Sequence, residues 1–355
     1  MKILFIITKS EVGGAQKFVS EQMKMLQKEN IASYLVTNKV GWLSNKVSSI
    51  AEDILYDMRI EKKTSLTFIS ILVSYIKENS IDVVVCNSAN GGMYGRLATF
   101  LTKAKSVYVS HGWSSIYNGG RWSYFLNRVE QFLAYIGDTV LCISENDFNA
   151  AISFIKVPVH KCILINNCIY PVSEYVRDQY LPRKTIKILF LGRLSHPKRP
   201  DLLIESIKNL KNVHLSIIGY GDYYQSLKIK IEQENITNVL LKGEIVNFDL
   251  FQEYDIFTLI SESEGLPMSA IEAMSCSLPL VLSDIGGCRP LINENGELVK
   301  NDIMSIQNGI KKCILRIEKY SKKSKEIFEK KYSLHPNKEK YIELYTSVLL
   351  NKPLR

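Results

Sequence analysis

Val83-Val84-Val85-Cys86 is a short apolar run with no polar residue alternating along it. A strand covered on one face alternates apolar and polar residues, whereas a strand buried on both faces does not. The run therefore predicts a central strand of a parallel sheet. Similar runs recur between segments of helical periodicity, which indicates βαβ units. Strands are expected at 3–7, 32–36, 82–86, 106–110, 138–143 and 162–165, then at 186–191, 213–218, 238–241, 255–259 and 279–282.

This alternation lapses once, around 167–185, where asparagines and prolines gather. A chain of 355 residues is long enough for about two domains. We expect an α/β fold of two doubly wound, Rossmann-like domains facing each other across a cleft. They are an N-terminal domain over 1–170, a linker over 171–185 and a C-terminal domain over 186–335, followed by a helix over 336–355 that returns to the first domain. Helices are expected at 15–29, 66–78, 302–319, 321–331 and 336–350.

Composition excludes several classes of protein. Hydrophobic residues make up 46% and charged residues 23%, as in ordinary globular chains rather than disordered or fibrous ones. No apolar run approaches the ~20 residues of a membrane-spanning helix, and the apolar start is too short for a signal peptide, so a cytoplasmic protein is expected. The seven cysteines form no CxxC pair, which favours reduced thiols over a disulfide framework or zinc site.

The net charge of +9 points to an anionic partner. Residues 300–340 hold 12 lysines and arginines against 5 acidic residues. An anionic membrane surface, a nucleic acid or a phosphorylated substrate would each fit this excess. No recognised nucleic-acid-binding module is present, so we expect no nucleic-acid partner.

Open α/β sheets bind ligands beyond the carboxyl ends of their strands, so residues that follow strands are candidates for function. In the first half, Gly13 and Gly14 follow the first strand and precede a helix, where they form either an anion-binding turn or simply a tight one. His111 ends the strand at 106–110, with a structural or a functional role open to it.

In the second half, the strand at 186–191 runs into Gly192-Arg193 and then Lys198-Arg199. Three cations in one loop favour a phosphate or diphosphate over a merely solvated loop. Gly219-Tyr220-Gly221 lacks the third glycine of a dinucleotide fingerprint, and a simple turn is an equal interpretation.

The most informative stretch runs from Ser261 to Met274. It places Glu264 before a helix start and Glu272 within the helix. The free amides at 265–268 suit a diphosphate or a sugar hydroxyl, and ionised carboxylates suit hydroxyl donors. A capping role for Glu264 and an exposed position for Glu272 are equally compatible with the pattern.

Together these motifs resemble glycosyltransferase family 4, the retaining nucleotide-sugar glycosyltransferases of GT-B fold. The resemblance spans nearly the whole chain, and its most specific feature is the spacing of Glu264 and Glu272 after a Gly-Arg…Lys loop. Its further motifs are Gly13-Gly14, Asp82-Val83-Val84-Val85, Ser110-His111-Gly112, Cys142-Ile143-Ser144-Glu145, Asn166-Asn167 and Ser283-Asp284-Ile285-Gly286-Gly287.

The resemblance implies a role for each matching residue. Arg193 and Lys198 would hold the donor diphosphate and stabilise it as leaving group, without a metal or other cofactor. Glu272 would bind the ribose hydroxyls, Glu264 the transferred sugar, and His111 would line the sugar site. The remaining donor-binding positions are backbone ones: Gly13, Gly14, Gly192, Gly219, Gly265, Leu266, Pro267 and Met268.

The implied reaction transfers a sugar, with retention, from a nucleotide-diphosphate sugar to a glycan or polyprenyl-diphosphate-linked acceptor in bacterial surface polysaccharide synthesis. UDP is favoured and GDP is possible as the carrier. The implied location is cytoplasmic, with peripheral attachment at the inner face of the cell membrane. Three departures from the family pattern bear on donor identity: Asn166-Asn167-Cys168-Ile169, Ser277, and Cys288-Arg289-Pro290 where an acidic residue is usual.

Two surfaces and two rival functions stay open. For the aromatic-rich stretch 113–135, core packing is preferred over contact with a membrane or a sugar acceptor; it holds Trp113, Tyr117, Trp122, Tyr124, Phe125, Phe132 and Tyr135, with Arg121 and Arg128. For the basic helix 311–331, a solvated face is preferred over an anionic bilayer. The rivals are an NAD-dependent dehydrogenase, disfavoured by the missing GxGxxG, and a non-catalytic nucleotide-sugar-binding scaffold of another transferase.

Overall fold

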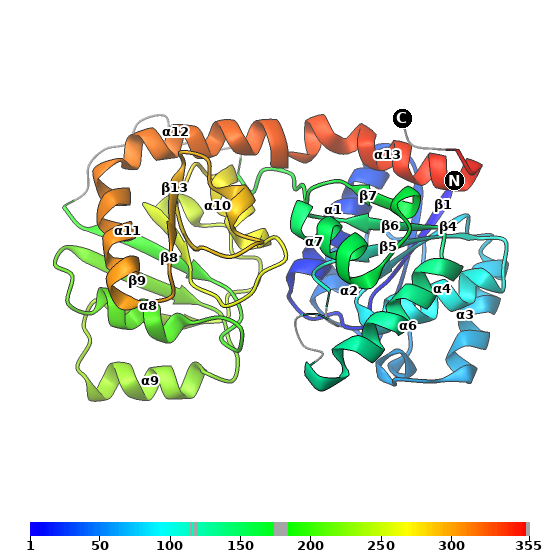
Figure 1. Cartoon of the computed structure of the whole chain (residues 1–355), viewed down its shortest axis with the longest axis horizontal. Helices are drawn as coiled ribbons and strands as arrows, with labels where there is room; N and C mark the ends of the chain where they lie inside the picture. Colours follow the sequence, from blue (N-terminus) through cyan, green and yellow to red (C-terminus); the bar gives the residue numbers. More distant parts are fainter. Residues whose placement is uncertain (114–115, 117–119, 174–183, 353–355) are drawn as a thin grey trace. The chain divides into compact units, whose positions relative to one another are not determined.

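The computed structural model describes residues 1–113, 116, 120–173 and 184–352. The chain divides into two compact units. Unit 1 comprises Met1–Asn167 with Asn337–Arg355, and unit 2 comprises Cys168–Pro336. Most of the predicted linker, residues 174–183, lies outside the described residues, as does Tyr117. Figure 1 shows the elements of both units.

Unit 1 is built on a sheet in which every strand pair is parallel, which confirms the predicted α/β class. The strand order is β3-β2-β1-β4-β5-β6-β7. Their bounds are β1 Lys2–Ile6, β2 Ala32–Thr37, β3 Ile54–Tyr56, β4 Val83–Asn87, β5 Lys105–Ser110, β6 Thr139–Cys142 and β7 Cys162–Leu164. The central β4 is buried along its whole length, as its unbroken apolar run predicts. The short edge strand β3 was not predicted.

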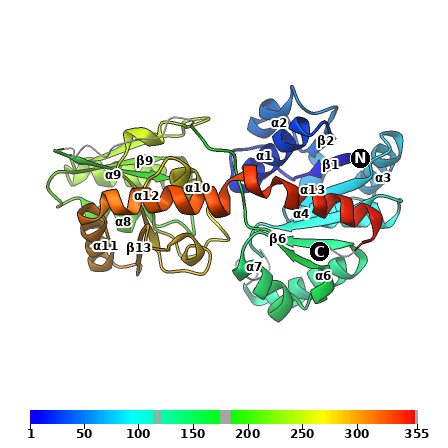
Figure 2. The same ribbon diagram turned by 90° about the horizontal axis from the view of Figure 1, so that it is seen from above.

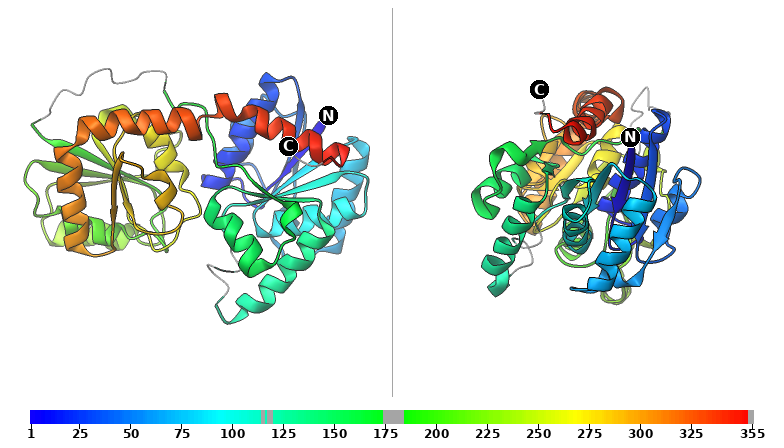
Figure 3. Two further views of the ribbon diagram at one scale, coloured as in Figure 1. Left: turned by 45° about the horizontal axis from the view of Figure 1, so that its top comes forward. Right: turned by 90° about the vertical axis from the view of Figure 1, so that its right-hand side faces the viewer.

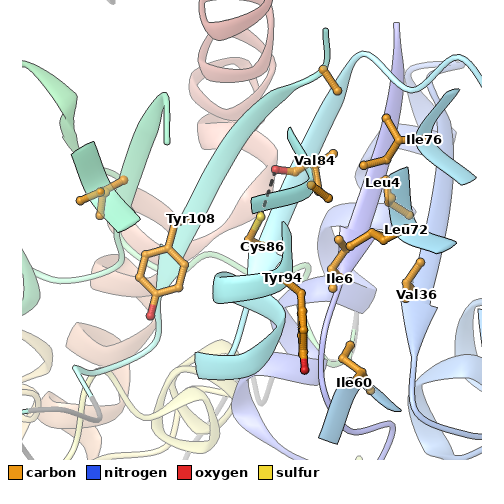
Figure 4. Packing of buried hydrophobic residues seen from close by; sticks show 14 of the residues in the cluster. Leu4, Ile6, Val36, Ile60, Leu72, Ile76, Val84, Cys86, Tyr94 and Tyr108 are labelled. Carbon is orange, nitrogen blue, oxygen red and sulfur yellow. Dashed lines mark hydrogen bonds between the residues drawn. The ribbon is translucent and has the colours of Figure 1, made fainter. Parts of the chain in front are cut away.

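Helices cover both faces of this sheet. They are α1 Gly14–Lys28, α2 Trp42–Val47, α3 Leu66–Glu78, α4 Ala89–Phe100, α6 Ser123–Ile136 and α7 Glu145–Ala150, with short turns η1 Met58–Glu61, η2 Gly120–Trp122, η3 Ala151–Ile155 and η4 Val159–Lys161. Figure 4 shows the core between the sheet and α3 and α4, where Leu4, Ile6 and Val84 pack with Leu72 and Tyr94. In the same view Cys86 Sγ lies 3.6 Å from the carbonyl oxygen of Val84.

The last helix, α13 (Leu334–Leu350), completes unit 1 from Asn337 onward. Tyr341 packs against Phe18 of α1, with ring centroids 6.2 Å apart, and its hydroxyl donates to the Asn166 carbonyl at 2.9 Å. The Tyr345 hydroxyl donates to Gln22 Oε1, also at 2.9 Å. Residues from the two ends of the sequence therefore share one core, and Figure 2 shows α13 beside α1.

Unit 2 holds a second parallel sheet, in the order β10-β9-β8-β11-β12-β13. Its strands are β8 Ile186–Leu191, β9 Val213–Ile218, β10 Val239–Gly243, β11 Ile256–Leu259, β12 Leu280–Ser283 and β13 Gly296–Val299. The strand β13 was not predicted. Strand order reverses between the neighbours β8 and β11, which is the point where open α/β sheets bind ligands.

The helices of unit 2 lie on both faces of its sheet (Figures 1 and 3). They are α8 Pro200–Ile207, α9 Tyr224–Gln233, α10 Met268–Ser275, α11 Ile303–Leu315 and α12 Ile317–Ile327, with η5 Phe251–Glu253, η6 Arg289–Leu291 and η7 Phe328–Tyr332. The two helices predicted over 302–319 and 321–331 are present, but the break between them lies at Arg316 and not at residue 320, because Arg316, with φ −124°, leaves the helical conformation between α11 and α12.

All seven cysteines are buried and reduced. Burial raises the pKa of Cys276 to about 11 and that of Cys86 to about 12, so both are thiols at neutral pH. Among the described residues, no helix combines the length and the apolar character that crossing a bilayer requires.

Candidate active site

The loop after β8 and the loop after β11 are joined by backbone hydrogen bonds at the switch point of unit 2. Arg199 N donates to the Ile260 carbonyl at 2.8 Å, and Glu262 N donates to the Pro197 carbonyl at 2.9 Å. Lys198 and Ser261 form an isolated β-bridge. Two stretches that are some 65 residues apart in the sequence therefore form one rigid structure, which holds Arg193, Lys198 and Glu264.

The three cations of the first loop have three different environments. Lys198 forms an ion pair with Glu264, and both side chains are largely buried. Arg199 is held by Asp201 at 2.8 Å and Glu262 at 2.9 Å, and these hydrogen bonds, chiefly that to Asp201, raise its pKa above the ordinary value. Arg193 is exposed and makes no hydrogen bond or ion pair with the described residues. Arg199 thus holds the loop in place through its acidic partners, whereas the exposed Arg193 is available to a ligand.

A small polar network fixes the loop that carries Glu264. Ser261 N donates to Ser283 Oγ at 2.9 Å, and Ser283 Oγ donates to Asn301 Oδ1 at 2.6 Å. Asn301 Nδ2 closes the circuit by donating to the Ser261 carbonyl at 2.9 Å. Sequence reasoning assigned no site role to Ser283 or Asn301. Their positions, at the last residue of β12 and two residues after β13, lie at the same edge of the sheet and were the available signal.

Gly287 packs directly against the backbone of the same loop. A methyl group at this position would overlap the carbonyl oxygens of Glu264 and Gly265. Glycine is therefore required here by close backbone approach. The position was part of a family motif in the sequence but was not predicted as a site residue.

The helix α10 begins at Met268, and Pro267 is its N-cap with extended backbone. No side chain caps this end, so its first amides are not claimed by a cap. Glu272 lies in the middle of the helix and is only 8% exposed. The interpretation of Glu272 as an ordinary exposed glutamate is therefore wrong.

Gly219 lets the loops after β8 and β9 touch. Its φ of +147° suits glycine, and a methyl group there would overlap the Gly192 carbonyl oxygen. A methyl group at Gly192 itself would meet nothing nearer than 3.8 Å. Space at Gly192 is thus open beside Lys198, as a position close to a ligand requires.

His111 follows β5 in unit 1, with its imidazole oriented by Asn87. The distance from His111 Nε2 to Asn87 Oδ1 is 2.8 Å, and Asn87 Nδ2 donates to the Val85 carbonyl at 3.2 Å, which fixes the amide orientation. Burial lowers the pKa of His111 to about 3, so the ring is neutral at physiological pH. Nε2 therefore carries the proton, and Nδ1 is left as an acceptor. Asn87 was not predicted.

Gly13 and Gly14 lie at the start of α1, where Gly13 is the N-cap and no side chain caps the helix. Gln16 Nε2 donates to the Lys9 carbonyl at 2.9 Å across this turn. Both glycines and His111 thus follow strands of the unit 1 sheet, β1 and β5 respectively.

The core-packing prediction for 113–135 holds for one residue and fails for most. Trp113 is buried, and its indole Nε1 donates to the Asp147 carbonyl at 2.9 Å. The aromatic side chains on and just before α6 are exposed: Trp122, Tyr124, Phe125, Phe132 and Tyr135. Tyr117 and the side chain of Arg121 lie outside the described residues. Within the described residues, no group of three His, Cys, Asp or Glu side chains has the arrangement of a metal site.

Family models cover both halves of the chain. Residues 12–171 match the model described as Glycosyltransferase Family 4, and residues 172–330 match that described as Glycosyl transferases group 1. The O-antigen biosynthesis glycosyltransferase WbnH of Escherichia coli is 40% identical over 299 residues, which are 84% of this chain and 85% of WbnH. The UDP-Gal:alpha-D-GlcNAc-diphosphoundecaprenol alpha-1,3-galactosyltransferase of Escherichia coli is 23% identical over 391 residues, covering 99% and 98% of the two chains.

Solved structures show the same fold. HepE of Anabaena, in complex with UDP and glucose, matches with a TM-score of 0.84 over 98% of this chain and 100% of its own, at 19% identity. Sucrose-phosphate synthase of Thermosynechococcus elongatus matches with a TM-score of 0.83 over 99% and 100%, at 16% identity. The sequence matches decide against a dehydrogenase. With its two Rossmann-like units of GT-B fold, this chain belongs to glycosyltransferase family 4.

Proposed function

We propose that this protein transfers a sugar from a UDP-sugar to a lipid-linked saccharide during O-antigen or related surface polysaccharide synthesis, with retention of anomeric configuration. The observation that carries the proposal is the rigid cluster at the switch point of unit 2. There the exposed Arg193, the Lys198–Glu264 pair and the uncapped start of α10 follow adjacent strands.

This cluster provides what departure of a nucleoside diphosphate requires. Negative charge grows on the diphosphate as the bond to the sugar breaks, and fixed positive groups stabilise that charge most effectively. Arg193 offers a rigid guanidinium fork, Lys198 a point charge and α10 its first amides. Because these groups are part of the protein, we expect the reaction to need no metal ion or other cofactor.

The acidic residues suit the hydroxyl groups of the donor. Glu272, buried within α10, is assigned to the ribose, and Glu264 to the transferred sugar. An ionised carboxylate only accepts hydrogen bonds, so both select ligands rich in hydroxyl donors. The neutral His111 offers Nδ1 as a further acceptor for a sugar hydroxyl, and Gly13 with Gly14 offers helix-terminal amides to phosphate oxygens.

The names of similar proteins support the choice of substrates. One relative is named for O-antigen biosynthesis and another for UDP-Gal and a diphosphoundecaprenol-linked acceptor. HepE has been crystallised with UDP and with UDP-glucose. A polyprenyl-diphosphate acceptor would place the reaction at the inner face of the cell membrane.

The first test is thermal unfolding of the wild type and of Arg193→Ala with UDP, GDP, ADP, CDP, TDP or NADH, in the presence of EDTA. A ligand at 100 times its Kd stabilises a protein by about 2.7 kcal/mol. Of these nucleotides, we expect only UDP to raise the Tm of the wild type, by several degrees. The variant should lose this response. Stabilisation by GDP would change the assigned donor, and no response to any nucleotide would favour a scaffold role.

The stereochemistry is tested separately by NMR of the product. After incubation with a UDP-α-sugar and a lipid-linked acceptor analogue, we expect an α linkage. A β linkage would contradict retention while leaving the donor assignment intact.

A further inference from the structure

The helix α6 presents an aromatic stripe to solvent. Phe125, Phe132 and Tyr135 are 60%, 59% and 74% exposed. They lie seven and three residues apart along the helix, a spacing that places them on one face together with Arg128. Trp122, which is 71% exposed, continues the stripe through an edge contact with Phe125 at 6.4 Å. We call these four aromatic residues the α6 stripe.

The opposite side of α6 is firmly anchored, so the stripe is not displaced core. Leu133 and Ala134 are buried, and Glu130 pairs with the buried Arg96 at 2.8 Å. Lys161 Nζ donates to the carbonyl oxygens of Tyr135 at 2.7 Å and Gly137 at 2.6 Å, which fixes the end of the helix. The helix therefore holds its aromatic residues outward in a defined orientation.

The surroundings of the stripe are basic. Segments 100–105, 120–138 and 154–161 hold six lysines and arginines against two acidic residues, Glu130, which is paired with Arg96, and Asp138, which is paired with Lys105 at 3.2 Å. Arg128 lies 5.5 Å from the ring centroid of Tyr124. Positive charge interleaved with exposed aromatic rings is complementary to an anionic, partly apolar surface.

The basic helix α12 differs from α6 both in its charge balance and in the exposure of its hydrophobic side chains. Its lysines are matched by neighbouring glutamates, as in the Lys322–Glu318 pair at 2.9 Å and the Lys323–Glu326 pair at 3.0 Å. In the described stretch from Ile317 to Tyr332, no large hydrophobic side chain is exposed. The preferred interpretation of this region as a solvated face therefore agrees with its contacts.

We propose that the α6 stripe is the surface by which this protein docks on an anionic lipid bilayer. Trp and Tyr favour the headgroup region, and Lys and Arg are attracted to anionic lipids. The proposal rests on the proposed function, because a lipid-linked acceptor is itself anchored in the bilayer. It adds the location and chemistry of the contact, with the helix lying in the interface.

Vesicle flotation tests the surface with matched variants. The test variant is Phe125→Ser/Phe132→Ser/Tyr135→Ser. The control is Tyr56→Ser/Leu66→Ser, which removes large exposed residues elsewhere in unit 1. With vesicles containing about one third phosphatidylglycerol, we expect the wild type and the control to float and the test variant to bind at least about tenfold less. Binding of the wild type should fall on adding salt and with phosphatidylcholine alone.

Trp122 supplies a second readout that does not depend on the triple variant folding. Its emission should shift to the blue when anionic vesicles are added, and this shift should be absent in Trp122→Phe. Unchanged emission, or flotation of the triple variant at the wild-type level, would overturn the proposal. A stripe that instead joins two copies of the chain would appear as a dimer lost in the triple variant, which also overturns it.

The UDP-induced rise in Tm separates this proposal from the proposed function. We expect the triple variant to retain that rise, because the stripe contains none of the residues assigned to the donor, and Arg193, Lys198 and the start of α10 lie in unit 2. Loss of flotation with the UDP response intact supports both proposals. Normal flotation of the wild type without any nucleotide response would leave the membrane surface standing and reject the donor assignment.

Discussion

At the scale of single residues, three cations in one loop show how context divides similar side chains into different tasks. Arg199 is occupied by two acidic partners, Lys198 shares its charge with Glu264, and Arg193 is exposed. Composition alone predicts an anion site in this loop. Only the partners tell which cation is available to a ligand.

The first prediction concerns that available cation. Arg193→Ala should lower turnover by about 100-fold or more, because it removes a positive charge that stabilises the negative charge of the leaving diphosphate. Since the side chain is exposed, the Tm should change by no more than about 1–2 °C. Sugar transfer and thermal unfolding are measured in parallel, with Lys311→Ala, another exposed lysine or arginine site, as the control. Near-normal turnover in Arg193→Ala would remove this residue from the site.

The second prediction concerns Glu272, assigned to the ribose. The wild type should bind UDP more tightly than 2′-deoxy-UDP, by about tenfold for a hydrogen bond to a charged group. Glu272→Gln, whose neutral amide oxygen still accepts a hydrogen bond, should show a weaker preference of about fivefold or less. Isothermal titration measures both affinities. A variant that keeps the full preference for UDP would place the ribose elsewhere.

The third prediction concerns His111 and pH. Its folded pKa of about 3 is below the ordinary value near 6.5, so below pH 6.5 the unfolded chain binds a proton that the native protein does not. The free energy of unfolding should therefore fall as pH drops from about 6.5 toward 3. Between pH 7 and 5, the wild type should lose about 2 kcal/mol more than His111→Gln, as measured by urea unfolding. Parallel curves for the two proteins would mean that His111 titrates normally.

At the scale of elements, the site is a set of strand ends held together by loops. The loops after β8, β9, β11, β12 and β13 meet through backbone contacts and the Ser261–Ser283–Asn301 circuit. The sheet supplies the common edge, and the glycines allow the loops to approach. A substitution that displaces the backbone of one loop should therefore displace the neighbouring loop as well.

Gly287 offers the fourth prediction, at this scale. In Gly287→Ala the new methyl group would displace the Glu264–Gly265 backbone, with a cost of about 1–3 kcal/mol in stability and a drop of at least about tenfold in turnover. Gly192→Ala is the matched comparison, since its methyl group has room. We expect unchanged stability there, so any loss of turnover reports crowding of the donor. A stable and fully active Gly287→Ala protein would contradict the close contact.

Elements were predictable where the sequence itself carries the pattern. Val83 to Cys86 is uniformly apolar and forms a buried central strand. The edge strands β3 and β13 were missed because they are short: β3 has only three residues, and the polar Glu297 interrupts the four residues of β13. The family motif located Glu264 and Glu272 along the chain. Burial of Glu272, the partners of Arg199 and the outward face of α6 depend on tertiary neighbours that no local pattern records.

At the scale of the whole molecule, the chain leaves unit 1 at Asn167 and returns to it at Asn337. Unit 1 therefore gains its last helix only after unit 2 has been made. The side chains of Tyr341, Leu344 and Tyr345 in α13 are fully buried. The stability of unit 1 should accordingly depend on the C-terminus of the chain.

The fifth prediction tests this dependence. Leu344→Ala should destabilise the protein by about 2–5 kcal/mol, because it leaves a cavity among buried side chains. Glu343→Ala, one position earlier on the exposed side of α13, should change stability by less than about 0.5 kcal/mol. Urea unfolding followed by circular dichroism compares the two. Equal midpoints would show that α13 adds little to unit 1.

The burial of every native cysteine makes this chain a ready substrate for site-specific labelling. Maleimide dyes react with accessible thiolates, and buried thiols react slowly because the dye cannot reach them. A cysteine introduced at one exposed position in each unit would therefore take up fluorophores without removal of the seven native residues. Dyes could thus be attached at chosen sites in either unit with the native core chemistry left unaltered.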